Sequence, residues 1–415
     1  MSRHGQGRGL LDTYRTRLQD EPFAGLVLLA GALVALVWSN SPWAHSYEAL
    51  TEYVVGPATL HLDLTLGEWA ADGLLAIFFF VVGLELKTEF VTGTLRDLRQ
   101  AFVPILAAVF GMLGPALFYT AVQAASDSGA YHGWAVPVAT DIAFAVAVLG
   151  IFGHGMPPGV RTFLLTLAVM DDLLGIVVIA IFYSGDLHLG ALLGAFGVIA
   201  VFGVLVNRRV TAWWLLVPLA VLAWGLMHAS GVHATIAGVL LGLTVPARTR
   251  RHEDEALTHA FTDRVQPWSA GLVLPVFAFF AAGVSVVESG GLEAMLTDPV
   301  SIGIYLGLPI GKLLGIWGGV ALLIRLTRLR LGHGIDLADI VPVALVAGIG
   351  FTVSLLIASL SFDAADPRSA HARVAVLVGS LLAAVLGALA LRLRVRVRIR
   401  GRGARRGYHP RRPEH

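Results

Sequence analysis

Long apolar runs, separated by short polar stretches, extend along most of the chain. An α-helix rises about 1.5 Å per residue, so crossing a hydrocarbon core about 30 Å thick takes about 20 apolar residues. Runs close to this length predict about twelve transmembrane helices and an all-α, polytopic membrane fold. The predicted spans are 23–39, 69–90, 101–123, 134–152, 161–183, 189–206, 213–227, 232–247, 268–287, 300–323, 338–360 and 373–392.

The composition agrees with this pattern. Of the 415 residues, 56% are hydrophobic and 14% are charged, whereas soluble domains carry about 25% charged residues. The chain has no cysteine, which excludes disulfides, thiolate metal sites and cysteine nucleophiles. The first apolar run lacks a small-residue cleavage site, so we interpret it as a span rather than a cleaved leader.

Arginines alternate between the loops. When the N-terminus is placed in the cytoplasm, every second loop is basic, and only Arg368 and Arg373 break the pattern. This asymmetry predicts that both termini lie inside and that the number of spans is even. The basic cytoplasmic loops contain Arg96, Arg99, Arg161, Arg208, Arg209, Arg248, Arg250, Arg251, Arg264, Arg325, Arg328 and Arg330.

The same rule divides the chain into three parts. They are a cytoplasmic segment (1–22), one transmembrane domain (23–392) and a basic cytoplasmic tail (393–415). Because the tail directly follows a hydrophobic helix, we interpret its charge as a membrane-side signal and expect no nucleic acid partner. An outer stretch, 53–66, alternates apolar and polar residues in a way that predicts a short hairpin.

Five ionisable residues lie inside apolar runs: Asp72, Asp141, Asp171, Asp172 and Lys312. Each charged group costs roughly 2.5–3.5 kcal/mol at the centre of a membrane on insertion scales. The five groups must therefore pair, lose their charge or face water, and a purely structural role for all of them is not expected.

Four separate runs place polar groups or helix breaks near one depth. Asp172 lies about ten residues into its run, hence about 15 Å deep, and Lys312 lies at a similar depth. Broken helices near the midplane are typical of the ion site of a transporter. The residues at this depth are Pro137, Thr140, Asp141, Asp171, Asp172, Lys312, Gly348 and Gly350.

The ligands on offer are carboxylate and hydroxyl oxygens, which suit small hard cations rather than soft transition metals. A carboxylate that holds either a proton or a cation couples the two flows without a chemical step. The residues leave sodium, lithium, potassium and calcium open. An intramembrane protease would need YD and GxGD motifs and a zinc protease HExxH, and none of these occurs. A symporter would need room for an organic substrate, and a channel would not need a lysine beside carboxylates.

Seven segments, in order along the chain, resemble the NhaA family of bacterial sodium/proton antiporters. Together they extend over nearly the whole chain from 23 to 394, and their combination is far more specific than any one of them. The segments are DGLLAIFFFVVGLELKTE (72–89), VPVATDIAFA (136–145), DDLLGIVVIAIFYSGDL (171–187), SGVHATIAG (230–238), LPVFAFFAAGVS (274–285), IGKLLGI (310–316) and GIGFTVSLLIASLSF (348–362).

The resemblance implies a twelve-helix fold with two inverted repeats, about 101–183 and 300–392, a symmetry for which this family is a known example. It implies that the fourth and eleventh helices are broken and cross at the midplane. It also implies an electrogenic exchanger of the bacterial cytoplasmic membrane that moves more protons inward than sodium or lithium ions outward, without a cofactor, and is silenced at acidic pH. Family members associate as dimers, so the outer hairpin is a candidate homodimer contact.

Carried over by motif position, Asp172 is the principal sodium ligand, with Thr140 and Asp141 nearby. Asp171 is either a proton carrier or the salt-bridge partner of Lys312. The resemblance thus implies one sodium site at these positions.

Four further residues are candidates for the funnels and the pH response. Glu85 and Glu89, four apart on one helix face, match the cytoplasmic funnel of the family, and Asp72 lies towards the outer mouth. His233 lies among small residues, where a histidine more often supports helix packing than senses pH. Both interpretations of His233 stay open.

Two positions depart from the family. Ala71 stands where an asparagine is usual before Asp72, and Thr262 stands at an aligned glutamate in the loop before Pro267. We expect altered regulation on the acid side and an intact ion site.

Overall fold

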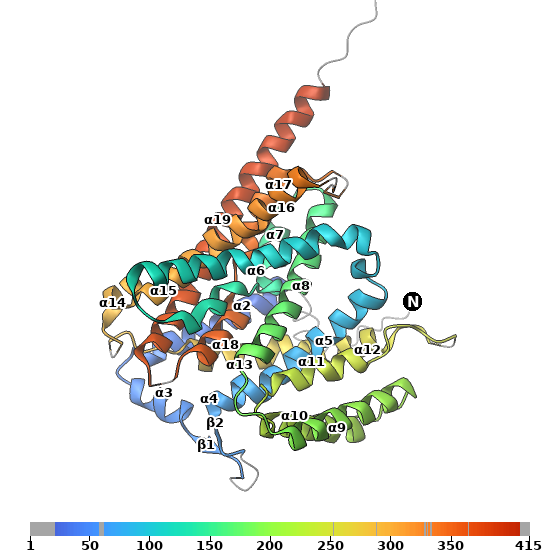
Figure 1. The fold of residues 1–415 in the computed structure, drawn as a ribbon, viewed down its shortest axis with the longest axis vertical. Helices are drawn as coiled ribbons and strands as arrows, with labels where there is room; N and C mark the ends of the chain where they lie inside the picture. The colour runs from blue at the N-terminus through green and yellow to red at the C-terminus, as the bar shows by residue number, and fades with distance from the viewer. Residues whose placement is uncertain are drawn as a thin grey trace, which may run out of the picture.

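The computed structural model describes residues 21–57, 62–251, 253–287, 289–327, 329, 331–332, 334–363 and 365–406. Residues 1–20 of the predicted cytoplasmic segment and residues 407–415 of the basic tail lie outside these ranges. The described chain is a bundle of crossing helices with one small β-ribbon (Figure 1). This agrees with the predicted all-α polytopic fold.

The first half of the bundle runs from α2 to α11 and contains the first break, between η4 and α7. Its helices are α2 (Glu21–Ser39), α3 (Ala44–Thr51), α4 (Leu66–Glu68), η2 (Trp69–Leu74), α5 (Leu75–Val91), η3 (Thr94–Arg96), α6 (Leu98–Ser126), η4 (Tyr131–Val138), α7 (Ile142–Phe152), α8 (Pro158–Phe182), α9 (Leu189–Asn207), α10 (Trp213–Ala229) and α11 (Thr235–Thr244).

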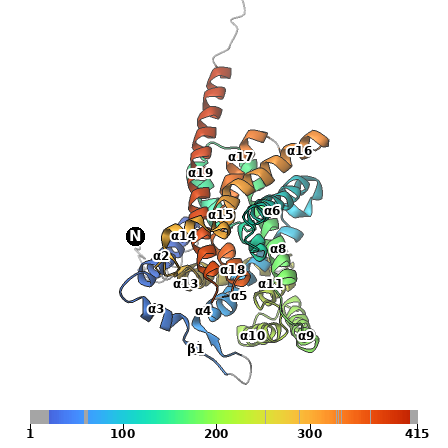
Figure 2. The same ribbon diagram turned by 60° about the vertical axis from the view of Figure 1, so that its left-hand side comes forward.

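The second half ends in the longest helix, α19, which rises out of the bundle as a straight rod (Figure 2). Its elements are α12 (Leu257–Trp268), η5 (Ser269–Val273), α13 (Leu274–Ala282), α14 (Gly291–Thr297), α15 (Pro299–Leu306), η6 (Gly307–Gly311), η7 (Leu313–Gly318), α16 (Gly319–Leu326), α17 (Leu337–Ala347), α18 (Phe351–Ser361) and α19 (Pro367–Arg406).

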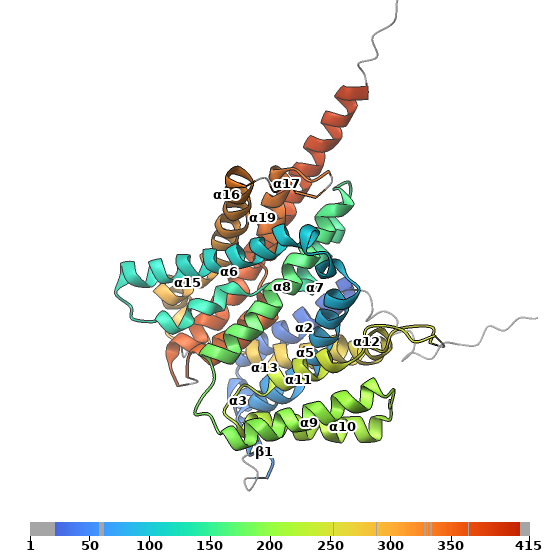
Figure 3. The ribbon, with the colours of Figure 1, turned by 45° about the vertical axis from the view of Figure 1, so that its right-hand side comes forward.

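Among the described residues, six helices are long and apolar enough to cross a membrane, or up to eight when each bent pair counts as one span. Shorter apolar helices occur at Phe23–Ser39, Trp213–Ala229 and Thr235–Thr244. Helical segments occupy all the predicted spans, and the count of twelve stays a prediction. Many outward side chains of α9 and α10 are apolar and exposed, as expected of surfaces in lipid, and these two helices lie together at one edge (Figure 3).

The predicted hairpin is confirmed. Strands β1 (Val54–Val55) and β2 (Leu64–Thr65) pair antiparallel, with Val54 opposite Thr65. Thr65 then caps the following helix. Its hydroxyl accepts the Glu68 N–H at 3.1 Å, and the Glu68 carboxylate accepts the Thr65 N–H at 2.7 Å. The ribbon therefore leads directly into the helix that carries Asp72.

Two helices are broken where the sequence predicted it. η4 and α7 bend by 42° around Ala139 to Asp141, and α17 and α18 bend by 56° around Gly348 to Gly350. Both segments predicted as repeats follow the same order of long helical segment, bent pair and long helix. The symmetry that would relate them stays a prediction.

The segment before Pro267, described above as a loop, is helical. Leu257, Phe261 and Trp268 recur at helical spacing, and Thr258 and Phe261 are buried, so one face packs against α5. Pro267 lacks an N–H, and the wider turn η5 begins two residues later. Thr262 therefore lies on a helix rather than in a loop.

Candidate ion site

A lysine–aspartate pair lies fully buried between α8 and the segment that joins η6 to η7. Lys312 Nζ lies 2.6 Å from Asp171 Oδ2, and both side chains are 0% exposed. Lys312 also donates to the Thr140 hydroxyl at 3.0 Å. Irregular helical turns on both sides of Lys312 are typical of functional positions. The sequence alternative in which Asp171 pairs with Lys312 is thus the arrangement in this structure.

The two helix breaks lie against each other at the same place. The Thr140 hydroxyl donates to the Ala347 carbonyl at 2.7 Å, and the Asp141 N–H donates to the Ile349 carbonyl at 2.6 Å. Each break thus satisfies backbone groups that the other leaves without a helical partner. Pro137 lies just before the first break, and Gly348 and Gly350 flank the second.

Asp141 is held by several donors at the start of α7. Its Oδ1 accepts the Phe144 N–H at 3.3 Å, as a helix N-cap does, and its Oδ2 accepts the Thr352 hydroxyl at 2.8 Å. The Thr352 N–H also lies 3.3 Å from Oδ2. The second break therefore supplies both partners of this oxygen.

Asp172 stands apart from its neighbours in having no such partner. It is 8% exposed, and none of the hydrogen bonds or ion pairs found between described residues reaches its carboxylate. The adjacent Asp171 and the nearby Asp141 and Glu85 repel its charge, whereas Lys312 attracts it. Of the three central aspartates, Asp172 is the one with neither carboxylate oxygen hydrogen-bonded to another described residue, whereas Asp171 has one oxygen without such a bond and Asp141 has none.

A cavity of about 140 Å³ opens at this carboxylate. A water molecule needs about 10–15 Å³ of such space, so the cavity has room for a small ion with several waters. Its lining combines polar groups with apolar walls from α2, α5 and η5. The polar lining residues are Glu85, Thr140, Asp141, Asp172, Gln266 and Thr352.

The predicted sodium ligands do not all face this space equally. The Thr140 hydroxyl already accepts from Lys312 and donates to the Ala347 carbonyl, and one Asp171 oxygen is paired with Lys312. In the described part of the chain, no three histidine or acidic side chains are placed to hold a metal ion together. A cation here would need Asp172, a second oxygen from the Asp141–Thr352 pair and water as its ligands.

A second, larger cavity of about 870 Å³ lies elsewhere, between α5, α10 and α12. Its lining is almost entirely apolar, with Arg264 stacked over Trp213 at 5.4 Å. None of the buried aspartates lines it. It therefore takes no part in the ion site.

The structure separates two residues that the sequence grouped together. Glu85 lines the ion cavity. Glu89 turns away and accepts the Thr94 N–H and hydroxyl, both at 2.9 Å, so it ties the end of α5 to η3. Glu89, one helical turn after Glu85 on α5, thus stabilises the local fold and does not line the cavity.

Asp72 and His233 are brought together. His233 Nε2 lies 3.2 Å from one Asp72 oxygen, and its Nδ1 lies 2.8 Å from the Thr235 hydroxyl. His228, which the sequence analysis did not single out, approaches the other Asp72 oxygen at 3.7 Å. The sequence offers no local spacing that would have found it, because His228 is near the end of α10 and Asp72 lies 156 residues earlier, in η2.

The sequence analysis also missed Thr352 and Ser380. Ser380 on α19 accepts the Gly350 and Phe351 N–H groups at 3.3 and 3.1 Å. A broken helix exposes N–H groups at its second half, so hydroxyls next to the break could have been expected.

Comparison with known proteins agrees with this geometry. The family model described as "Na+/H+ antiporter 1" matches residues 15–391. This chain belongs to that family. The match includes both breaks, the buried ion pair and Asp172, and it identifies a transporter family rather than an enzyme family.

Several curated members of the Na+/H+ antiporter 1 family are similar to this chain. "Na(+)/H(+) antiporter NhaA 1" of Salinispora tropica is 56% identical over 391 residues, which is 93% of this chain and 88% of the relative. "Na(+)/H(+) antiporter NhaA 2" of Kineococcus radiotolerans is 55% identical over 382 residues, 90% of this chain and 83% of the relative. "Na(+)/H(+) antiporter NhaA" of Frankia casuarinae is 54% identical over 379 residues, with 90% and 85% covered. The chain is therefore a multi-pass membrane protein of a bacterial antiporter family.

Proposed function

We propose that this protein exchanges sodium ions, and also lithium ions, for protons across a bacterial cytoplasmic membrane. The observation that carries the proposal is Asp172, a buried carboxylate without a hydrogen-bonding partner among the described residues, at a cavity sized for a small ion. The names of the relatives support sodium and protons as the ions. No cofactor is needed, because exchange requires only that one site holds either ion.

The cavity argues against an organic substrate. Sites for drug-sized molecules measure about 300–1,000 Å³, whereas the space at Asp172 is about 140 Å³. The Lys312–Asp171 pair is fully buried, so these two charges do not line an open, water-filled pore as the charges of a channel would. Both features favour an exchanger that alternates its access.

The arginine pattern supports an orientation with both termini in the cytoplasm. We propose that sodium leaves the cell and protons enter, with more protons than sodium ions per cycle. Asp171 and Lys312 are the groups placed to carry the further proton, and Glu85 and the Asp72–His233 contact are the candidates for the pH response. The β-ribbon, with Val54 and Val55 exposed, is the surface we propose for a homodimer contact.

A sodium pulse tests the proposed exchange directly. Reconstituted vesicles with a pH-sensitive dye inside should show proton movement opposite to sodium when sodium is added on one side. A symporter would move protons in the same direction as sodium or none at all. Vesicles in which sodium leaves the internal pH unchanged would rule out the proposed exchange.

The dependence on pH tests the shared site. If protons and sodium compete for Asp172, the half-saturating sodium concentration should rise by up to about tenfold for each unit that pH falls, wherever the site is mostly protonated. Saturating sodium should then relieve acid inhibition. Inhibition that persists at saturating sodium would instead assign acid silencing to a separate sensor, with Glu85 and the Asp72–His233 contact to be replaced first.

A further inference from the structure

Four charged side chains join the C-terminal part of α19 to the N-terminal end of α17, away from the ion cavity. Arg394 Nε and Arg398 Nε donate to Asp339 Oδ1 at 2.8 and 2.9 Å, and Arg398 Nη2 donates to Asp339 Oδ2. Nη2 of each arginine also reaches Asp336 Oδ2, at 3.0 and 3.1 Å. We call these four residues the α17–α19 clamp.

The clamp is anchored on a fully buried carboxylate. Asp339 is 0% exposed, whereas Asp336 is 68% exposed at its side chain. Asp339 Oδ2 also accepts the Asp336 N–H at 2.7 Å, which closes the first turn of α17. A buried carboxylate held by two arginines, one of them bidentate, fixes direction as well as distance, since guanidinium donors are planar and rigid.

The helix that the clamp holds ends at the ion site. α17 has only eleven residues, and its far end presents the Ala347 carbonyl to the Thr140 hydroxyl. Just beyond it, the Ile349 carbonyl accepts the Asp141 N–H. A displacement at the start of so short a helix is transmitted to these carbonyls about 16 Å away.

α19 holds the broken helix at both ends. Ser380 accepts the N–H groups of Gly350 and Phe351 at the break, and Arg394 and Arg398 grip the start of α17. Ser380 and Arg394 are fourteen positions apart, which is about 21 Å of helix and comparable to the length of α17. Arg392, next to the clamp, also stacks over Phe152 at the end of α7, with 4.7 Å from its guanidinium to the ring centre.

We infer that Arg394 and Arg398 are positioning residues for the ion site: through Asp339 they set the place of α17, whose end holds Thr140 and Asp141. The inference rests on the proposed function, because the site they position is the sodium site. It gives the first part of the basic tail a role in transport besides its role in orienting the chain.

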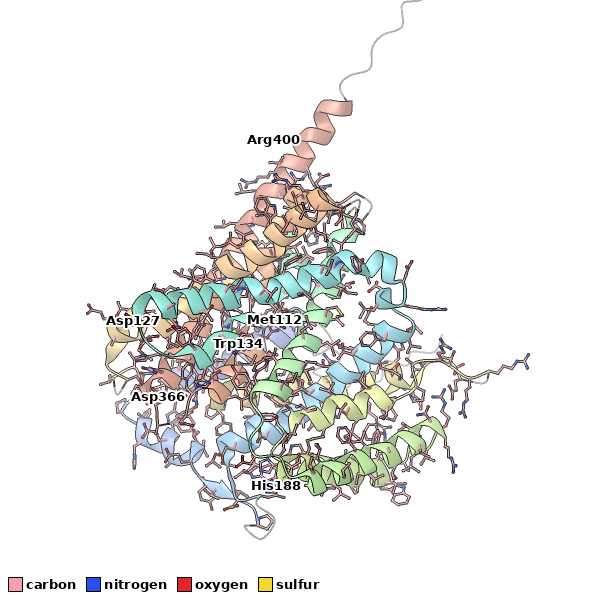
Figure 4. The ribbon with its side chains drawn as sticks, in the orientation of Figure 1. Met112, Asp127, Trp134, His188, Asp366 and Arg400 are labelled. Atoms are coloured by element: carbon pink, nitrogen blue, oxygen red, sulfur yellow. The ribbon has the colours of Figure 1, made fainter. Side chains whose placement is uncertain are left out.

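The same helix provides a matched control on its opposite face. Arg394 and Arg398 are four residues apart and share one face, whereas Arg396 and Arg400 lie on the other face. Arg396 and Arg400 are exposed, and among the described residues neither forms an ion pair with an acidic side chain. Figure 4 shows Arg400 on the part of α19 that extends beyond the bundle.

The test compares two double variants of the full chain that lose the same charge. In purified R394Q/R398Q, equilibrium sodium binding, measured well below the melting temperature, should be about tenfold weaker than in the wild type. The sodium concentration that half-saturates exchange should rise by the same factor, and the maximal exchange rate should be nearly unchanged. R396Q/R400Q should match the wild type in sodium affinity, in half-saturating sodium concentration and in maximal exchange rate. If R394Q/R398Q does not fold, R394K/R398K keeps both charges, loses the bidentate geometry and should show a smaller loss of affinity.

Each result decides the inference. If a clamp variant that folds has a lower melting temperature than the wild type but the same sodium affinity, the clamp only stabilises the fold, and the inference is overturned. An equal loss of affinity in R396Q/R400Q would overturn it too, because the effect would then belong to tail charge in general. Wild-type protein that binds sodium but does not exchange it would count against the proposed function alone, since the affinities still decide the role of the clamp.

Discussion

Asp172→Asn should reduce sodium-driven proton movement by about a hundredfold, the factor that corresponds to losing a strong contact to a charged ligand. The amide keeps the shape of the side chain and removes the charge that would bind sodium. It also cannot take up and release a proton in the physiological pH range, so both halves of the exchange fail together. The measurement is the sodium pulse in reconstituted vesicles.

The same variant should stay folded. Asp172 has no hydrogen bond or ion pair among the described residues, and the carboxylates around it repel its charge, so its neutralisation breaks no contact and removes unfavourable burial of a charge. Its melting temperature without sodium should be no lower than that of the wild type. Near-normal exchange by Asp172→Asn would remove Asp172 from the centre of the proposed mechanism.

Asp127→Asn is the matched control. Asp127 lies exposed in a turn at one end of the bundle (Figure 4), and it is not among the residues that line the ion cavity. Its φ of 49° is a left-handed conformation that asparagine also tolerates. This variant removes the same charge, should keep exchange and stability, and so distinguishes the loss of a site carboxylate from the loss of any carboxylate.

The buried charges were the part of the site that sequence predicts best. A charged residue in an apolar run must find a partner or face water, and Lys312 and Asp171 do pair, while Asp172 faces the cavity. The breaks just after Pro137 and around Gly348 were predictable for a different reason, because proline and glycine interrupt apolar runs that are otherwise long enough to be continuous helices.

Contacts that depend on helix packing could not be predicted. Glu85 and Glu89 share a helix face, yet only Glu85 lines the cavity, because Glu89 meets Thr94 in the next turn of the chain. Thr352 reaches Asp141 only because the two breaks cross. Their sequence separation of 211 residues carries no local signal.

The basic tail illustrates a different limit. The rule that places arginine on the cytoplasmic side treats all the tail arginines alike. The structure divides them by helix face, since Arg394 and Arg398 bind Asp339 while Arg396 and Arg400 are exposed. α19 also continues past the predicted span end at 392, because arginine is a good helix former and no proline or glycine intervenes before residue 401.

Lys312→Ala should lower the free energy of unfolding by about 3–5 kcal/mol, the loss expected when one partner of a buried ion pair is removed. Asp171 would be left fully buried, and its Oδ1 already lacks a hydrogen-bonding partner among the described residues. Thr140 would lose the donor that its hydroxyl accepts from. Thermal and chemical unfolding in detergent, without sodium, measure the loss.

The double variant Lys312→Ala/Asp171→Asn separates the stranded charge from the lost packing. If the stranded carboxylate causes most of the loss, the double variant should be more stable than Lys312→Ala alone, and Asp171→Asn alone should be destabilised too, because it strands the lysine instead. Strictly additive losses would mean that the two side chains do not interact, contrary to their 2.6 Å contact. The same pair lies beside Asp172, so the double variant can also be tested for transport. If it regains stability but still shows no sodium-driven proton movement in vesicles, Asp171 and Lys312 take part in proton transfer as well as in the fold.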